Sequence, residues 1–280
     1  MKRFLYFLVL SSSLLFLLVS CDKVEEEQYW VYAGANGTWY DTDEDVPAVQ
    51  RAFVEKYTGV RCVNCPKADV VLHDALAKYG EQLVVVAIHS GAFGEPYSGD
   101  EDLRTGDGSK WYEYFGISGQ PAALLMRAKN GAAWDIFTPT SNFDDKIDAV
   151  ISPAPEVSIK VVPVADGGKT TGADIYLSFE KTVDDSLTLT LLLTEDKIYT
   201  AQDSRTKARI ENYEQNHVLR AIITDPWGTD VAASGAAGEK RTVRLPFDMN
   251  ERWHAENCHL VAFVSDKSSR RILNVAQASL

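Results

Sequence analysis

Two cysteines separated by two residues, Cys62 and Cys65, have the spacing of a thiol–disulfide centre. They follow an apolar run at 49–57 and precede a helical pattern, so both are predicted to lie where a strand turns into a helix. The positive end of a helix stabilises a thiolate, and the neighbouring Arg61 adds a second positive charge. One thiolate of such a pair attacks a disulfide and the other resolves the product. The alternative is a small structural disulfide or an unreactive pair.

A second stretch of the sequence supports the interpretation of the two cysteines as a thiol–disulfide centre. Residues 114–121 end in Gln120-Pro121 and run into the apolar segment 122–126. Cis peptide bonds are almost confined to proline, so Pro121 is the credible site for one. Together with the cysteines, this run resembles the thioredoxin family, in which a cis-proline faces the Cys-x-x-Cys. The resemblance implies that Pro121 faces Cys62 and Cys65, and that the chain at Gln120 pairs with an extended substrate.

The sequence departs from the thioredoxin pattern at two positions. A tryptophan usually precedes the first cysteine, where this chain has Arg61, and a buried acid stands six residues upstream, where it has Lys56. Glu55 is adjacent, but neighbouring strand residues face opposite sides of a sheet. The departure implies attack by Cys62 with slow release of the mixed disulfide.

The beginning of the chain is predicted to be a signal peptide over residues 1–20, with Lys2 and Arg3 before an apolar core. Residues 18–21 resemble the bacterial lipobox, which implies lipidation of Cys21 and membrane attachment through that lipid. The alternative is an ordinary signal peptide followed by a stray cysteine. The acidic run at 22–27 resembles the export tag of Bacteroidetes surface lipoproteins, or serves as a solvated tether.

The acidic composition of the chain limits the classes of molecule that it is expected to bind. The chain of 280 residues has a formal net charge of −12, which is poorly matched to nucleic acid. No cofactor is indicated, and no metal site either, because His254, Cys258 and His259 lack a fourth ligand at suitable spacing. Cys258 is predicted to be a lone buried thiol, the alternative being a pairing with Cys62.

The predicted fold is α/β followed by all-β. An acidic and aromatic arm occupies 21–47, a thioredoxin-like domain 48–151, a proline-rich linker 152–155 and an immunoglobulin-like β-sandwich domain 156–280. In the first domain the patterns predict a helix from Pro66 that ends at Gly80, a buried strand at 83–88 and a closing helix at 143–151. The glycine-rich stretch 91–108 is predicted to be a lid or binding loop, or a mobile segment. Residues 201–220 are predicted to form a long loop or a short helix.

The polar run at 213–220, the lipobox, the Cys-x-Asn-Cys-Pro centre and the ending 261–264 together resemble the Omp28-related outer membrane lipoproteins of Bacteroidetes. The resemblance implies a lipid-anchored outer-membrane protein, on the cell surface or the periplasmic face, with a binding or adhesion role and an unknown protein or surface partner. The alternative function is an envelope thiol–disulfide oxidoreductase. In it Cys62 attacks, Cys65 resolves, Arg61 tunes the thiolate, and Gln120 and Pro121 position the substrate.

Overall fold

The computed structural model describes residues 37–140, 143–206, 209–232 and 235–280. The helices are α1 (Cys65–Tyr79), α2 (Gly106–Tyr114) and α3 (Phe143–Ile151), with short 3₁₀ turns η2 (Gly80–Gln82), η3 (Ala92–Gly94) and η4 (Ala255–Asn257). The strands are β1 (Tyr40–Asp41), β2 (Ala52–Thr58), β3 (Leu83–His89), β4 (Ala122–Leu125), β5 (Lys129–Asn130), β6 (Ala133–Trp134), β7 (Val157–Asp166), β8 (Lys169–Phe179), β9 (Leu187–Glu195), β10 (Ile198–Gln202), β11 (Ile210–Gln215), β12 (Val218–Ile222), β13 (Thr229–Ala232), β14 (Lys240–Pro246), β15 (Cys258–Asp266) and β16 (Ile272–Ser279).

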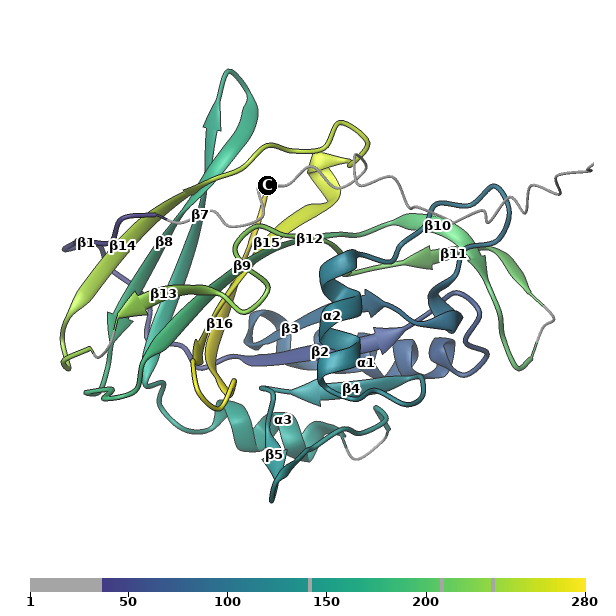
Figure 1. Cartoon of the computed structure of the whole chain (residues 1–280), viewed down its shortest axis with the longest axis horizontal. Helices are drawn as coiled ribbons and strands as arrows, with labels where there is room; N and C mark the ends of the chain where they lie inside the picture. The colour runs from purple at the N-terminus through teal and green to yellow at the C-terminus, as the bar shows by residue number, and fades with distance from the viewer. Residues whose placement is uncertain (1–36, 141–142, 207–208, 233–234) are drawn as a thin grey trace, which may run out of the picture.

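A mixed sheet of eight strands runs through the molecule in the order β16-β15-β9-β12-β3-β2-β4, with β13 paired to β9 (Figure 1). Strand β3 is parallel to both of its neighbours, β2 and β12. Every residue of β3 is buried, as its continuous apolar run predicts for a central parallel strand. Because β12 comes from the second half of the chain, the two halves share one sheet.

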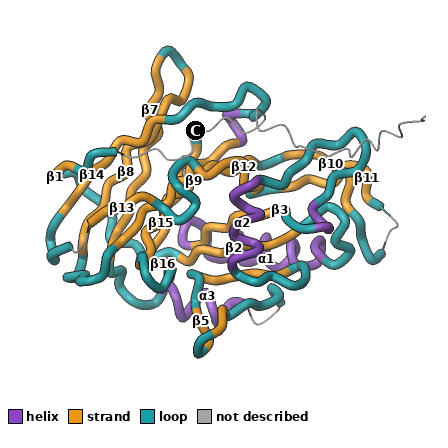
Figure 2. Tube along the Cα trace, in the orientation of Figure 1, coloured by secondary structure: helices purple, strands orange, loops and turns teal. Residues whose placement is uncertain are grey.

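A second sheet, in the order β1-β14-β8-β7, lies at the end of the molecule away from the helices (Figure 2). Its apolar side chains pack on Leu260 and Ala262 of β15, whereas Val261 and Phe263 enter the core that contains α1 and α2. Successive strand residues point to opposite faces, so β15 separates two cores. The helices gather on the β2–β3–β4 part of the central sheet (Figure 2).

The predicted elements of the first half are present. The predicted helix is α1, which ends at Gly80 with φ +52°, and the closing helix is α3. The glycine-rich stretch contains η3 and the start of α2, and residues 201–220 form β11 and parts of β10 and β12 rather than a helix. None of the helices in the described ranges is long and apolar enough to span a bilayer.

The second half is rich in strands, as the period-two pattern predicts, and the fold as a whole is mixed α/β. Strands β9, β12, β15 and β16 extend the sheet of the first half instead of closing a sheet among themselves. An immunoglobulin-like arrangement of residues 156–280 and a domain boundary at 152–155 therefore stay predictions.

Candidate functional site

The two cysteines of the Cys-x-x-Cys motif are joined. Cys62 and Cys65 form a disulfide, and Cys65 is the first residue of α1. A tight turn shapes the loop before the helix, since Cys62 N–H donates to Gly59 O at 3.0 Å and Cys65 N–H to Cys62 O at 3.2 Å. Pro66 fits the first helical turn because its missing N–H would have no partner there. The disulfide thus lies at the positive end of a helix.

The peptide bond between Gln120 and Pro121 is cis. Strand β4 starts directly after it, and Ala122 pairs with Tyr57 at the end of β2, which leads into the cysteine loop. Both loops border one groove of about 1450 Å³, whose lining includes Val63 and Pro121. The structure therefore brings the two predicted segments to the same groove.

The walls of this groove combine apolar and charged side chains. Val63, between the two cysteines, is 43% exposed, and Ile136, which also lines the groove, is 38% exposed. Lys67 of α1 lines the groove, and Lys78 lies at 2.8 Å from Asp144 in it. Apolar side chains left in contact with water beside charged ones are typical of interaction sites.

Gln120 has its side chain fixed on the end of β3. Its Nε2 donates to Ser90 O at 2.9 Å and to Ser90 Oγ at 3.2 Å. Its Oε1 is buried without a hydrogen-bond partner among the described residues. A substrate-binding role for Gln120 stays a prediction, and its side chain holds the cis-proline loop against β3.

Arg61 is directed at the loop that follows η3. Its Nε donates to Glu95 O at 2.9 Å and its Nη2 to Pro96 O at 2.7 Å, and its Cζ lies 5.2 Å from the ring centroid of Tyr97. These contacts hold residues 95–97 beside the cysteine loop. Tuning of a thiolate by Arg61 stays a prediction.

The disulfide is inaccessible in this structure. Cys62 is 2% exposed and Cys65 is fully buried. The side-chain amide of Gln202 donates to Cys62 O at 3.0 Å. Sequence patterns did not point to Gln202, because a lone polar residue in a polar stretch carries no local signal of a contact 140 residues away.

A second cavity of about 260 Å³ lies beside the other face of α1. There the ammonium of Lys56, at the position where thioredoxins have an acid, pairs with the carboxylate of Asp69 on α1. Asp69 also accepts from Tyr213 Oη at 2.8 Å, and burial raises the pKa of Tyr213, with a further contribution from Asp69. An acid is thus present near the start of α1, but it neutralises a buried lysine.

His89, the last residue of β3, is 1% exposed, and neither ring nitrogen has a hydrogen-bond partner in the described part of the chain. Burial, together with the charges of Lys56 and Arg220, lowers the pKa of His89 to about 3. The imidazole is therefore neutral at ordinary pH.

Cys258 is a buried free thiol at the start of β15, as predicted for a lone cysteine. Burial, with a smaller contribution from Glu195, raises the pKa of Cys258 to about 12. The thiol is thus protonated and shielded.

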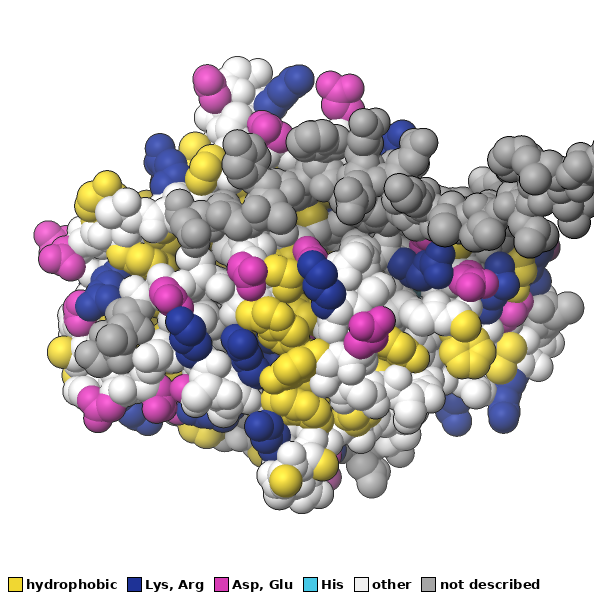
Figure 3. All heavy atoms as spheres, in the orientation of Figure 1, with side chains coloured by type: hydrophobic (Ala, Val, Ile, Leu, Met, Phe, Trp, Pro, Cys, Tyr) yellow, Lys and Arg dark blue, Asp and Glu magenta, His cyan; other side chains and the backbone are white. Residues whose placement is uncertain are grey.

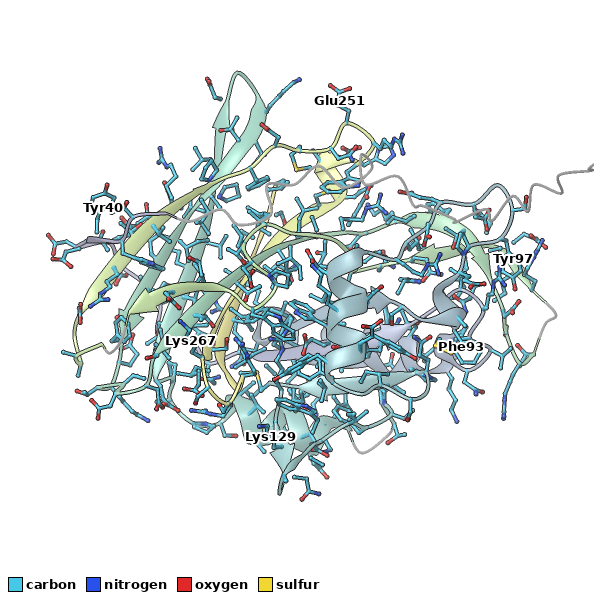
Figure 4. The ribbon with its side chains drawn as sticks, viewed as in Figure 1. Tyr40, Phe93, Tyr97, Lys129, Glu251 and Lys267 are labelled. Carbon is cyan, nitrogen blue, oxygen red and sulfur yellow. A yellow bond between two sulfur atoms is a disulfide. The ribbon has the colours of Figure 1, made fainter. Side chains whose placement is uncertain are left out.

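Hydrophobic side chains also gather beside α2 on the face shown in Figure 3, with Lys and Arg side chains next to them. Ring contacts there join Tyr114 to Trp227 at 4.4 Å and to Trp134 at 6.1 Å. Nζ of Lys129, a residue labelled in Figure 4, lies 4.5 Å from the ring centroid of Trp134. Tyr114 is half exposed, so this is a second apolar surface, apart from the groove.

The predicted signal peptide, Cys21, the acidic run 22–27 and most of the aromatic arm lie outside the described residues.

The fold and the site together define a mixed α/β protein in which the loop of a Cys-x-x-Cys disulfide and a cis-proline border one groove. Residues 108–280, more than half of the chain, match the family described as "Outer membrane protein Omp28". The chain therefore belongs to the Omp28 family, and this membership supports an outer-membrane location.

Two solved structures are similar over most of the chain. HBP35 of Porphyromonas gingivalis has a TM-score of 0.63 at 16% identity, covering 84% of this chain and 77% of that one. Protein AGR_C_4864 from Agrobacterium tumefaciens has a TM-score of 0.51 at 15% identity, covering 82% of this chain and 95% of that one. Identities this low show a shared fold alone. A domain of the outer membrane lipoprotein Omp28 from Porphyromonas gingivalis gives a TM-score of 0.30 at 18% identity, over 46% of this chain and 90% of that one. No curated protein matches the chain.

Proposed function

We propose that this protein binds an extended segment of another protein in the groove beside its Cys62–Cys65 disulfide. The observation that carries the proposal is the placement of the disulfide loop and the cis-proline at Pro121 on one groove of about 1450 Å³. The order β2-α1-β3-α2-β4-α3 along the chain supports a thioredoxin-like unit at 48–151. In such a unit an extended chain pairs with the backbone before the cis-proline.

Three features favour binding over turnover. Both sulfur atoms are buried, and the groove presents the exposed apolar side chains Val63 and Ile136. The carboxylate of Asp69, on α1, is engaged by the ammonium of Lys56. An extended segment can therefore contact the groove while the disulfide stays closed.

Binding can be tested with an unfolded probe, reduced and carboxymethylated α-lactalbumin, and the full chain. Val63→Asp and Ile136→Asp each place a charge in the groove, and we expect about tenfold weaker binding, or about 1.4 kcal/mol, by fluorescence anisotropy. Val70→Asp is the matched control, because Val70 is an exposed apolar residue of α1 that lines the other cavity and not the groove. Failure of the unaltered chain to bind the probe, or equal losses in all three variants, would refute the proposal.

The second candidate function is thiol–disulfide exchange, favoured by a disulfide at a helix N-terminus beside a cis-proline. Cys62 would attack, Cys65 would resolve, and Gln120 and Pro121 would position the substrate strand. A redox titration, with insulin reduction by the protein and its Cys62→Ser variant, tests this function. A pair that resists reduction leaves only the binding function.

We further propose that a lipid on Cys21 holds the protein at the outer membrane. The sequence around Cys21 and the family membership support this anchoring. We expect Cys21→Ser to move the protein out of the membrane fraction. Replacing Glu25, Glu26 and Glu27 by Ala, followed by protease digestion of intact cells, tests whether the acidic run directs the protein to the cell surface.

A further inference from the structure

A segment from the second half of the chain closes over the cysteine loop. Residues 201–205, called the strap here, begin in the last two residues of β10 and continue past its end. Asp203 N–H donates to Val60 O at 2.7 Å, and Arg205 N–H donates to Val63 O at 3.1 Å. Two residues of the strap thus donate main-chain hydrogen bonds to carbonyl oxygens on both sides of Cys62.

A buried side chain reinforces this main-chain pairing. The Nε2 of Gln202 donates to Cys62 O at 3.0 Å and to Gly59 O at 3.3 Å, and Gln202 is 1% exposed. Its Oε1 accepts from Nε2 of Gln215 on the neighbouring strand β11 at 3.0 Å. The amide group of Gln202 is therefore oriented by the β10–β11 hairpin and bonded to the cysteine loop.

Two residues of the loop after η3 fasten the strap from the outside. Tyr97 Oη donates to Asp203 Oδ1 at 2.7 Å, and Ala201 N–H donates to Asp100 Oδ2 at 3.1 Å. Figure 4 shows Tyr97 at the edge of the molecule, close to the end of the β10–β11 hairpin. These contacts are part-buried and few, so we expect them to break more easily than the core does.

We propose that the strap is a gate: the Cys62–Cys65 disulfide becomes reactive only when residues 201–205 lift from the cysteine loop by local opening. This inference rests on the proposed function, because it concerns how access to the same cysteine site is regulated. The strap bonds to the loop that carries Cys62, and both cysteines are buried while it is in place. Detachment of the strap exposes the sulfur atoms without unfolding the sheet beneath them.

Reduction by dithiothreitol, a small dithiol, reports the opening. A thiolate of the reagent attacks Sγ of Cys62, the bond to Cys65 breaks, and Sγ of Cys65 leaves as a thiolate that takes up a proton. The second thiol of the reagent then closes its own disulfide and releases the Cys62 thiolate, which takes up another proton. Two electrons thus pass from the reagent to the protein. The Cys62–Cys65 disulfide is reduced to two thiols, and the two thiols of the reagent are oxidised to a disulfide.

The test compares reduction rates of the full chain under native conditions, followed by alkylation and mass spectrometry. Tyr97→Phe and Asp203→Ala each remove the hydrogen bond between these two side chains, and we expect about fivefold faster reduction, the effect of one typical hydrogen bond. Tyr199→Phe is the matched control, because Tyr199 makes a similar 2.8 Å bond to Glu214 on the same hairpin, away from the strap. We expect its rate to be unchanged.

The Arg127→Met variant distinguishes local opening of the strap from unfolding of the whole protein. Arg127 is buried in the core and makes no contact with the strap, so its replacement lowers overall stability and leaves the gate intact. Unchanged reduction in Arg127→Met with faster reduction in Tyr97→Phe supports the gate. Equal rates in all variants, or rates that follow the free energy of unfolding, would overturn it. Because no protein partner takes part, loss of the gate leaves the test of segment binding unaffected.

Discussion

Arg127 and Glu55 form a bidentate ion pair inside the hydrophobic core. Nη2 of Arg127 lies 2.7 Å from Oε1 of Glu55, Nε lies 3.0 Å from Oε2, and the side chains are 1% and 0% exposed. The guanidinium also lies 4.4 Å from the ring of Trp111. Because neither charge reaches water, each depends on the other for stabilisation.

Removing one partner of this pair is therefore expected to be costly. Arg127→Met leaves Glu55 as an unpaired buried charge, so we expect the free energy of unfolding to fall by about 3–5 kcal/mol in a urea titration. The double variant Glu55→Gln with Arg127→Met carries no buried charge and should lose less than the single variant. A double variant less stable than the single one would contradict this account.

An ion pair at the surface provides a comparison for the buried pair of Arg127 and Glu55. Arg244 and Asp174 make a similar contact at 2.7 Å, but the arginine side chain is 66% exposed. Arg244→Met should change stability much less than Arg127→Met, because the exposed guanidinium is solvated by water and its attraction to Asp174 is screened.

The same region shows what local patterns predict and what they miss. Alternation along β2 places Glu55 and Lys56 on opposite faces, and their partners, Arg127 beyond β4 and Asp69 on α1, confirm it. The partners themselves were not predicted, since no local pattern links residues that meet only when distant segments pack.

The elements around the site were predictable for physical reasons. The apolar spacing and Gly80 indicate α1, the continuous apolar run indicates β3, and the restriction of cis bonds to proline indicates Pro121. These signals lie within short stretches of the chain. The cover over the cysteines was not predictable, because Gln202 contacts Cys62 across 140 residues of the chain and no local pattern records such a contact.

His89 should make stability depend on pH. Its pKa is lowered from 6.5 to about 3 in the fold, so the unfolded chain binds a proton between these values and the folded chain does not. The stability due to neutral His89 is complete above pH 6.5 and is lost as the pH falls toward 3. We expect this group to contribute a slope of about 1.4 kcal/mol per pH unit below pH 6 in urea titrations.

His89→Leu isolates that contribution, because leucine fills the buried site without a titrating group. Between pH 6 and 4, the free energy of unfolding of this variant should change less steeply with pH. The difference corresponds to about one proton fewer taken up per molecule on unfolding. An unchanged slope would mean that His89 is protonated in the folded state.

Cys258 should be inert while the protein is folded. It is 1% exposed and its pKa is about 12, so at pH 8 about one molecule in ten thousand carries the thiolate. We expect iodoacetamide to label Cys258 negligibly in buffer and fully in urea, as read by mass spectrometry. Rapid labelling in buffer, or an oxidised peptide pair that joins Cys258 to Cys62, would contradict this expectation.

Gly59 allows the cysteine loop to approach η3, which leads into the loop that fastens the strap. A Cβ at Gly59 would overlap the carbonyl of Phe93, which also accepts a 2.9 Å hydrogen bond from Arg61 N–H. Main-chain atoms cannot yield as a flexible side chain can, so Gly59→Ala should displace η3 together with the loop that follows it and cost about 1–3 kcal/mol of stability. Gly106→Ala is the control, because open space surrounds that position.

The same substitution should affect the disulfide. Since Tyr97 stands in the displaced loop, Gly59→Ala should also speed reduction of the disulfide. Gly106→Ala should leave both the stability and the reduction rate near those of the unaltered chain. A Gly59→Ala protein with unaltered stability would show that the loop after η3 moves freely and does not hold the strap.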